Sequence, residues 1–279
     1  GAVAATTPTK SNRWPALAAG VLVLLAAAIG LFWFSSDSEQ IKSLAVLPFE
    51  NASGDPEQIA ALRSSIAASW ERSGERERAA EEYLEVWTRY PWTEPARVAD
   101  EALNSLREPL EEPRRGARQY RERGDAFYKK RSNEEALAAY DRALALGGMD
   151  RGERLRVKRQ RADTSFRLRR YREAAIAYAE LPPDDETQIE KARSYARSGD
   201  IPRAIRELES LGARASSAHA PRANLLAGLL ADGEGELERA EAFFEKALRG
   251  RSRTVSAVAG WQLGWSRYRA KRFAEAIEY

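Results

Sequence analysis

The stretch YRERGDAFYKKRSNEEALAAYDRALA, residues 120–145, decides the fold of this chain. Its first half places Gly124 and Phe127 on one face of a helix, and its second half does the same for Ala136 and Tyr140. The small residue of each helix allows a paired helix to approach closely, whereas the large residues fill the space between them. The stretch therefore predicts two helices that pack on each other as a hairpin.

The same pattern recurs along the chain, with an alanine at one fixed point of each hairpin. These alanines are Ala79, Ala136, Ala174, Ala204, Ala240 and Ala276. Their separations are 57, 38, 30, 36 and 36 residues, and all but the first lie near the period of about 34 residues of tetratricopeptide repeats (TPRs). Such hairpins bury their apolar faces by stacking on their neighbours. We therefore expect an all-α, right-handed TPR-like α-solenoid whose concave surface binds partners.

The first, longer separation contains EPARVADEALNSLREPLEEPRRG, residues 94–116. We interpret it as one amphipathic helix from Pro95 to Leu106, followed by a loop interrupted by prolines. A generic helical bundle with accidental periodicity is the alternative to the whole repeat assignment.

A long apolar segment, PALAAGVLVLLAAAIGLFWF, occupies residues 15–34 and carries no charge. At about 1.5 Å per residue such a helix spans roughly 30 Å, which is the thickness of a bilayer's hydrocarbon core. We predict a single transmembrane helix over residues 14–35. A cleaved signal peptide is the alternative, but the apolar run is long and no A-x-A cleavage site follows it closely.

The charges that flank this segment predict its orientation. Lys10 and Arg13 precede it, while Asp37 and Glu39 follow it. The positive-inside rule places residues 1–13 in the cytoplasm as a short stub. The expected location is therefore the bacterial inner membrane, crossed once, with the repeat domain in the periplasm.

Residues 36–58 are predicted to be a juxtamembrane linker with a short strand at Ile41–Phe49. Within it, IKSLAVLPFENASGDPEQ at residues 41–58 resembles the opening strand and turn of the TolB-amino-terminal-like segment. That segment follows the transmembrane helix in bacterial receptor-type serine/threonine kinases and transcriptional regulators. The D-G-x-T-E continuation of the segment is missing here, so we assign only a linker. The TPR-like repeat domain is predicted over residues 59–279.

The last two repeats resemble a second family. RANLLAGLLADGEGELERAEAFFEKALRG at residues 222–250 and WQLGWSRYRAKRFAEAIEY at residues 261–279 are similar to the helical superhelix of soluble lytic transglycosylases. The resemblance extends over residues 60–279 and implies a role in peptidoglycan turnover. In that family a separate C-terminal lysozyme-like domain carries one catalytic glutamate. The Glu209-Ser210 pair lacks that domain's following G-L-M-Q-type segment, so we assign it to a helix surface.

Few residues in the chain suit catalysis or metal binding. Cysteine is absent, which excludes disulfides and thiol catalysis, and His219 is the only histidine. We expect His219 to lie in an exposed loop, and acid pairs such as Asp184-Asp185 to mark helix starts. The sequence nominates no catalytic residue, no metal site and no cofactor, so whether the intact protein is an enzyme stays open.

The candidate site is a surface rather than a cluster of catalytic groups. The segment Arg151–Arg172 holds ten basic residues against two acidic ones, although the net charge of the chain is only +3. In the usual TPR register the first helices turn basic and aromatic residues into the concave groove. The predicted groove residues are Arg121, Tyr128, Arg159, Phe166, Arg167, Arg197, Trp261, Trp265 and Tyr268. Arg118, Lys129, Arg156 and Arg193 belong to the same helix faces.

Such a groove suits an acidic protein or peptide segment, or a peptidoglycan glycan that carries carboxylates. The alternative is a solvated helical face in an arginine-rich protein. Nucleic acid is disfavoured because the predicted anchor places the groove outside the cytoplasm. The leading function is a membrane-anchored periplasmic scaffold, the non-catalytic arm of a lytic transglycosylase-like protein. The alternative function is the extracytoplasmic sensor region of a transmembrane kinase or regulator.

The first residue is Gly1, and the last, Tyr279, falls inside the second helix of a repeat. We therefore expect the sequence to be part of a longer protein, truncated at its C-terminus.

Overall fold

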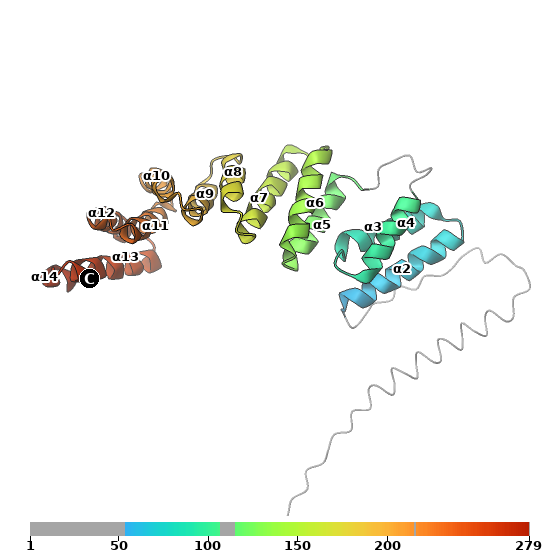
Figure 1. The fold of residues 1–279 in the computed structure, drawn as a ribbon, viewed down its shortest axis with the longest axis horizontal. Coiled ribbons are helices and arrows are strands. Elements are labelled where there is room, and N and C mark those ends of the chain that lie inside the picture. Colours follow the sequence, from blue (N-terminus) through green and yellow to red (C-terminus); the bar gives the residue numbers. More distant parts are fainter. Residues whose placement is uncertain (1–53, 107–114, 215, 279) are drawn as a thin grey trace, which may run out of the picture. The chain divides into compact units, whose positions relative to one another are not determined.

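The computed structural model describes residues 54–106, 115–214 and 216–278, and residues 51–279 form one compact unit. The described elements are all helices (Figure 1): α2 (Pro56–Arg72), α3 (Arg76–Arg89), α4 (Glu94–Ser105), α5 (Ala117–Lys129), α6 (Asn133–Leu146), α7 (Arg151–Arg167), α8 (Tyr171–Ala179), α9 (Asp185–Arg197), α10 (Ile201–Gly212), α11 (Ala220–Gly233), α12 (Leu237–Leu248), α13 (Arg253–Arg269) and α14 (Phe273–Ala276).

The predicted cytoplasmic stub, transmembrane helix and short strand lie outside the described residues. The helices that are described include none with the length and apolar character needed to cross a membrane. The predicted anchor and its orientation therefore stay predictions.

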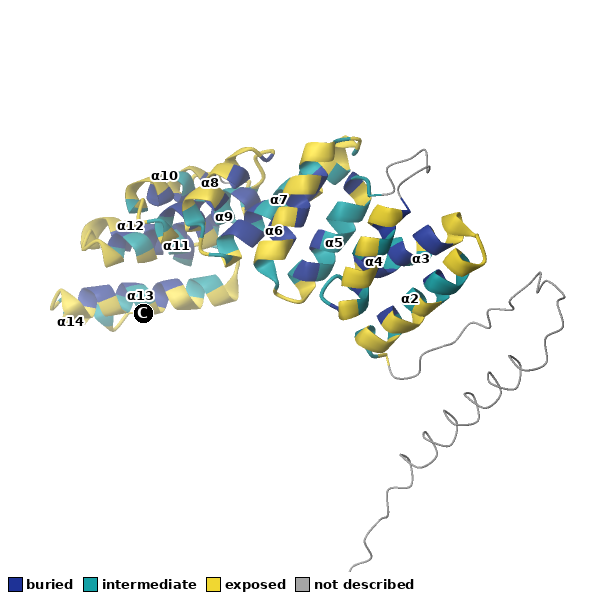
Figure 2. Ribbon diagram, turned by 45° about the vertical axis from the view of Figure 1, so that its right-hand side comes forward, coloured by how far each residue is buried: buried dark blue, intermediate teal, exposed yellow. Residues whose placement is uncertain are grey.

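From α5 onward the helices pair as hairpins and the hairpins stack in chain order. Within each hairpin the two helices contact each other, and the second helix of one hairpin contacts the first helix of the next. Figure 2 shows buried residues along the sides by which neighbouring helices meet, and exposed residues on their outer sides. This arrangement is the repeat stacking that the sequence predicts.

The turn inside each hairpin has the same backbone conformation. The second of its three residues has a positive φ in all six described hairpins: Gly74, Arg131, Arg169, Gly199, Gly235 and Lys271. The residue after it donates its N–H to the carbonyl five residues earlier, at 2.9–3.1 Å. These bonds satisfy carbonyls at the end of the first helix, as in a Schellman motif. Three of the six positions lack glycine, although the left-handed region costs roughly 1–2 kcal/mol for other residues.

The core of each hairpin is a small residue against a large one. The first five anchor alanines are fully buried, and the large residue four positions later is at most 3% exposed in each case. On the facing helix, a Cβ added to Gly228 would lie 2.5 Å from the Phe244 ring. A Cβ added to Gly124 would lie 2.6 Å from the Tyr140 ring. The predicted close approach of paired helices is confirmed.

The first unit of the repeat, α2 to α4, differs from the later hairpins because it has three helices. The predicted helix Pro95–Leu106 is confirmed as α4, which begins one residue earlier. The N–H of Glu94 donates to the Glu57 carboxylate at 3.3 Å, so α4 and α2 begin at the same end of the unit. Arg115, just before α5, pairs with Asp100 at 3.0 Å, while Lys130, just after α5, lies over Trp92 at 4.7 Å.

Helix α5 therefore runs back toward the end at which α2 and α4 begin. Helices α5 and α7, in contrast, run in the same direction, since Tyr128 and Arg167 in their last turns are in contact. Because α4 is inserted, α5, the first helix of the second hairpin, runs opposite to α2, the first helix of the first hairpin.

Trp87 joins this first unit to α5. Its ring contacts the guanidinium groups of Arg115, at 5.0 Å, and Arg123, at 4.3 Å, and meets the Tyr120 ring edge-on at 5.1 Å. Burial lowers the pKa of the Arg123 guanidinium to about 10. Cation–π contacts of this desolvated kind are worth up to about 2 kcal/mol, so this contact stabilises the irregular junction.

In the last hairpin Leu263 of α13 is fully buried in the apolar core, while charged groups hold α14. Arg267 of α13 is only 8% exposed and pairs with Glu245 of α12 at 3.1 Å, and more distantly with Glu241 and Glu275. Helix α14 contributes no buried residue, and its anchor alanine Ala276 is only partly buried. The second helix of the sixth repeat therefore departs from the apolar packing predicted for it, whereas Leu263 of the first helix follows it.

We predict that Gly228→Ala lowers the free energy of unfolding by about 1–3 kcal/mol, because the new methyl group overlaps the Phe244 ring. Chemical denaturation followed by circular dichroism measures the loss. Gly233→Ala in the same helix is the control: nothing lies within 4 Å of its Cβ, and it should leave stability unchanged or slightly raised. Equal stability of both variants would contradict the packing described.

Candidate binding surface

The first helices of the second, third and fourth hairpins meet through side chains that the sequence assigned to the groove. The Arg167 guanidinium of α7 lies 3.6 Å from the centre of the Tyr128 ring of α5. The Arg193 guanidinium of α9 lies 5.3 Å from the Phe166 ring of α7. Each contact crosses from one hairpin to the next, so these residues form one continuous face, here called the first-helix face.

Three tyrosines in the second helices each hold a carboxylate of the first helix. Tyr140 donates to Asp125 at 2.8 Å, and Tyr178 donates to Asp163 at 2.5 Å. Tyr83 makes the equivalent bond to Glu71 at 3.2 Å. Burial raises the pKa of Tyr83 to about 12, and burial likewise raises the pKa values of Tyr140 and Tyr178. These hydroxyls therefore stay protonated donors at neutral pH.

Asp163 is an acid of the first-helix face whose pKa is perturbed. Burial raises the pKa of its carboxyl group, while the hydrogen bond from Tyr178 and the nearby Arg159 and Arg167 lower it. Burying a carboxylate is costly unless donors surround it. Tyr178, Arg159 and Arg167 therefore hold the Asp163 carboxylate in place in the middle of the face.

The structure divides the predicted cations into paired and unpaired ones. Arg121 is 16% exposed in its side chain and pairs with Glu122 at 3.0 Å and Asp125 at 3.4 Å. Arg159 pairs with Asp184, the N-cap residue of α9, at 3.0 Å. These two side chains are committed to the protein itself, so a ligand would have to displace a carboxylate to use them.

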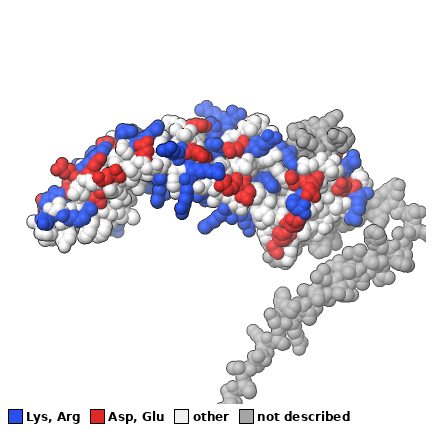
Figure 3. All heavy atoms as spheres, viewed as in Figure 1, with Lys and Arg blue, Asp and Glu red and all other residues white. Residues whose placement is uncertain are grey.

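Acidic residues that are distant in sequence pair with several cations of the segment Arg151–Arg172 in the structure. Neighbouring helices supply acids to Lys158 (Glu180), Arg161 (Asp141) and Arg170 (Glu134), besides the Asp184 that pairs with Arg159. Figure 3 shows cationic groups gathered around the middle helices with acidic groups set among them.

Some cations remain uncommitted. Lys129, Arg156 and Arg197 are exposed, and none forms a hydrogen bond or ion pair with any described residue.

The three aromatic residues predicted in the sixth repeat lie together on α13. Trp261, Trp265 and Tyr268 are 62%, 46% and 54% exposed. The Trp261 and Trp265 rings are parallel, with centres 6.3 Å apart, and Trp265 and Tyr268 stack at 5.6 Å. Within the described chain no hydrogen bond, ion pair or ring contact connects them to the arginines of α5, α7 and α9. The nine predicted groove residues thus form two groups.

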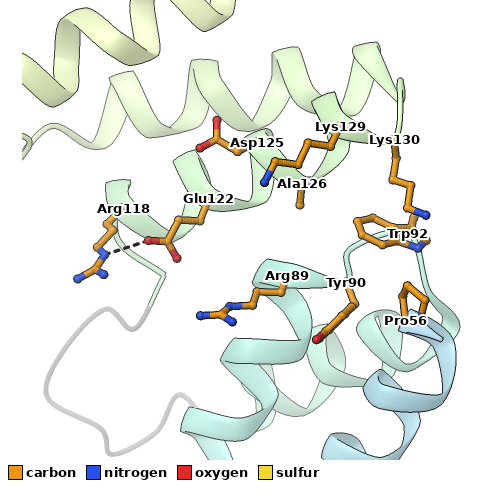
Figure 4. A pocket seen from close by; sticks show the side chains of 10 residues that line it. All are labelled: Pro56, Arg89, Tyr90, Trp92, Arg118, Glu122, Asp125, Ala126, Lys129 and Lys130. Carbon is orange, nitrogen blue, oxygen red and sulfur yellow. Dashed lines mark hydrogen bonds and ion pairs between the residues drawn. The ribbon is translucent and has the colours of Figure 1, made fainter. Parts of the chain in front are cut away.

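A cleft of about 700 Å³ lies between the first unit and α5 (Figure 4). It is lined by Pro56, Arg89, Tyr90, Trp92, Arg118, Glu122, Asp125, Ala126, Lys129 and Lys130. Of these, sequence reasoning singled out only Arg118 and Lys129. Pro56, Arg89, Tyr90, Trp92 and Lys130 come from helix ends that become neighbours only because α5 reverses direction. The aromatic stretch around Trp92 is the sequence signal that could have pointed to them.

The remaining residues of chemical interest lie as follows. His219 precedes α11 and is partly exposed, and Asp184 caps α9 by accepting the Thr187 N–H at 2.8 Å. Glu209 and Ser210 are exposed on α10. The described residues contain no group of three side chains that could hold a metal ion.

Comparison with known proteins finds no matching family model and no matching curated protein. Solved structures do resemble the chain. MamA (41-end) from Desulfovibrio magneticus RS-1 is 22% identical, covering 58% of this chain and 89% of that one, with a TM-score of 0.47. YrrB, described as a TPR protein with an unusual peptide-binding site, is 20% identical, with coverages of 72% and 91% and a TM-score of 0.45.

The Naa15/Naa10 structure bound to HypK-THB is 15% identical, covers 79% of this chain and 35% of that one, and has a TM-score of 0.50. At these identities the likeness shows the fold alone. The predicted all-α TPR-like repeat fold is confirmed. The resemblances to lytic transglycosylases and to the TolB-type segment are not shown and stay predictions.

We predict that Tyr178→Phe lowers the free energy of unfolding by about 1–3 kcal/mol at neutral pH, since it leaves the Asp163 carboxylate without its hydroxyl donor. The pKa of Asp163 is already raised, so its charged form is the costly one in the folded state. Protonation removes that charge, and the deficit should shrink as pH falls through the raised pKa.

Denaturant titrations at several pH values measure this effect. Tyr171→Phe is the matched control, because the Tyr171 hydroxyl bonds no described residue. A deficit that is independent of pH would show that the carboxylate is not the group affected.

Proposed function

We propose that this chain is a TPR-like protein-interaction scaffold that binds an acidic peptide segment along its first-helix face. The observation that carries the proposal is the set of exposed, unpaired cations on the face where arginines cover the aromatic rings of consecutive first helices. Arg156 and Arg197 are free to pair with carboxylates, and the Arg167–Tyr128 and Arg193–Phe166 contacts present flat surfaces on the same face. YrrB, which shares the fold, is described as having a peptide-binding site.

The face is rigid enough to select a ligand. Tyr140 and Tyr178 fix the two carboxylates Asp125 and Asp163, so each of these first helices is tied to the second helix of its own hairpin. Arginine donates two parallel hydrogen bonds to a carboxylate, and such charge-assisted bonds are roughly twice as strong as neutral ones. A peptide with acidic side chains therefore fits better than a basic or neutral one.

We predict that Arg197→Glu weakens binding of a fluorescein-labelled polyglutamate peptide to the full chain in detergent by about tenfold, as loss of one charge-assisted contact implies. Fluorescence anisotropy measures the affinity. Arg206→Glu on α10 is the control, because it makes the same charge change at an exposed cation of a second helix. A polyglutamine peptide should not bind.

Equal affinity of the Arg197→Glu and Arg206→Glu variants would place the ligand elsewhere. Binding that does not weaken with salt would exclude the proposed ion pairs.

The membrane anchor is a further part of the proposal. Residues 15–34 support a single span, and the flanking charges support a periplasmic repeat domain. The resemblance over residues 60–279 favours the non-catalytic arm of a lytic transglycosylase-like protein, with a peptidoglycan glycan as partner. The resemblance at residues 41–58 favours the second candidate, the sensor region of a transmembrane kinase or regulator.

Sedimentation with purified murein sacculi separates these two candidates. Enrichment of the full chain that is lost in Arg167→Glu supports the glycan partner. No enrichment favours the sensor.

We predict that alkaline phosphatase fused after residue 58 is active in a bacterial host, because that enzyme folds only where disulfides form, outside the cytoplasm. Deletion of residues 14–35 should abolish the activity while leaving the fusion protein in the soluble fraction. Activity that survives the deletion, or a full-length fusion without activity, would contradict the proposed topology.

A further inference from the structure

The cleft beside α5 exists because the chain inserts one helix into the repeat. In the later hairpins the first helix packs against the hairpin before it. Helix α5 also packs on the hairpin before it, through α3, but it follows α4 in the chain and runs back toward the end at which α2 begins. Pro56 at the start of α2 and Trp92 before α4 thereby come to face the last turn of α5 across about 700 Å³ (Figure 4).

The charges of the cleft favour an anion. Four of its lining residues are cationic and two are anionic. Both carboxylates are already satisfied: Glu122 accepts from Arg118 and Arg121 at 3.0 Å each, and Asp125 accepts from Tyr140 at 2.8 Å. Arg89 is likewise engaged, since it pairs with Glu85 at 2.9 Å.

Two lysines of the cleft have no carboxylate partner among the described residues. Lys130 places its ammonium group over the Trp92 ring at 4.7 Å. Lys129 forms no hydrogen bond or ion pair with any described residue. Figure 4 shows both side chains extending from the last turn of α5, with Lys130 ending at Trp92.

The wall opposite these lysines is made of rings. Tyr90 and Trp92 meet edge to face with their centres 6.4 Å apart, and Pro56 lies beside them. Both aromatic residues are partly exposed. A ligand group that enters here meets flat apolar surface on one side and ammonium groups on the other, which suits a side chain ring next to a carboxylate.

We infer that this cleft is an anchor site for a peptide segment that pairs a carboxylate with an adjacent aromatic or proline ring. The inference rests on the proposed peptide-binding function. It places one end of the bound peptide in the cleft, outside the first-helix face. The carboxylate pairs with Lys129 and Lys130, and the ring packs on Tyr90 and Pro56. A segment that continues from the cleft passes Arg118 and reaches the first-helix face.

The test uses the full chain in detergent and a fluorescein-labelled peptide that alternates glutamate with tryptophan and proline. We expect Lys129→Glu to weaken its binding about tenfold in fluorescence anisotropy, the loss of one charge-assisted contact. Arg206→Glu should leave the affinity unchanged. A peptide with alanine in place of the rings should bind more weakly to the unmodified chain, and its affinity for the Tyr90→Leu variant should equal its affinity for the unmodified chain.

The outcomes separate this inference from the proposed function. Weakening by Arg197→Glu without weakening by Lys129→Glu overturns the anchor site and leaves the first-helix face as the binding surface. Weakening by Lys129→Glu alone supports the anchor site and counts against the first-helix face. No binding of the peptide overturns the anchor site, with the polyglutamate probe still testing the face. Soluble murein fragments that outcompete the peptide, with the same loss in Lys129→Glu, overturn the assignment to a peptide.

Discussion

The close approach of two helices at a small residue is the constraint on which the whole repeat depends. Gly124 and Gly228 lie against the rings of Tyr140 and Phe244 with no room for a methyl group, and the buried anchor alanines stand at the matching places on the second helices. This contact sets the distance within a hairpin. That distance decides where the first helix of the next hairpin can lie, and so which side chains share a face.

The same contact also positions the chemistry of the binding surface. The Tyr140 ring that fills the space at Gly124 carries the hydroxyl that holds Asp125, and Tyr178 does the same for Asp163. One side chain thus packs the hairpin with its ring and organises the surface with its oxygen. Where the large residue is Leu208 or Phe244 this second role is missing, and the tyrosine–carboxylate pairs are confined to the earlier hairpins.

Features that depend on the spacing of nearby residues could be predicted from the sequence. Features that depend on which distant segments lie side by side could not. The anchor alanines and the helix at residues 95–106 follow from periodicity alone, and the structure agrees with them. The pairing of Arg159 with Asp184 joins residues 25 apart and has no local pattern. The cleft needs Pro56, Trp92 and Lys130 together, which requires the direction of α5, and a repeat period does not specify direction.

The ionic attachment of α14 has a mechanical consequence. Separating α13 from α12 would expose Leu263 and the apolar core around it, whereas α14 has no buried residue of its own and its release would let Arg267 and the surrounding glutamates gain water. Opening at α14 is therefore the least costly way for the described repeat to unwind. Proteases would find their first cleavable bonds there, and raised ionic strength would speed their entry while leaving the interior of the repeat intact.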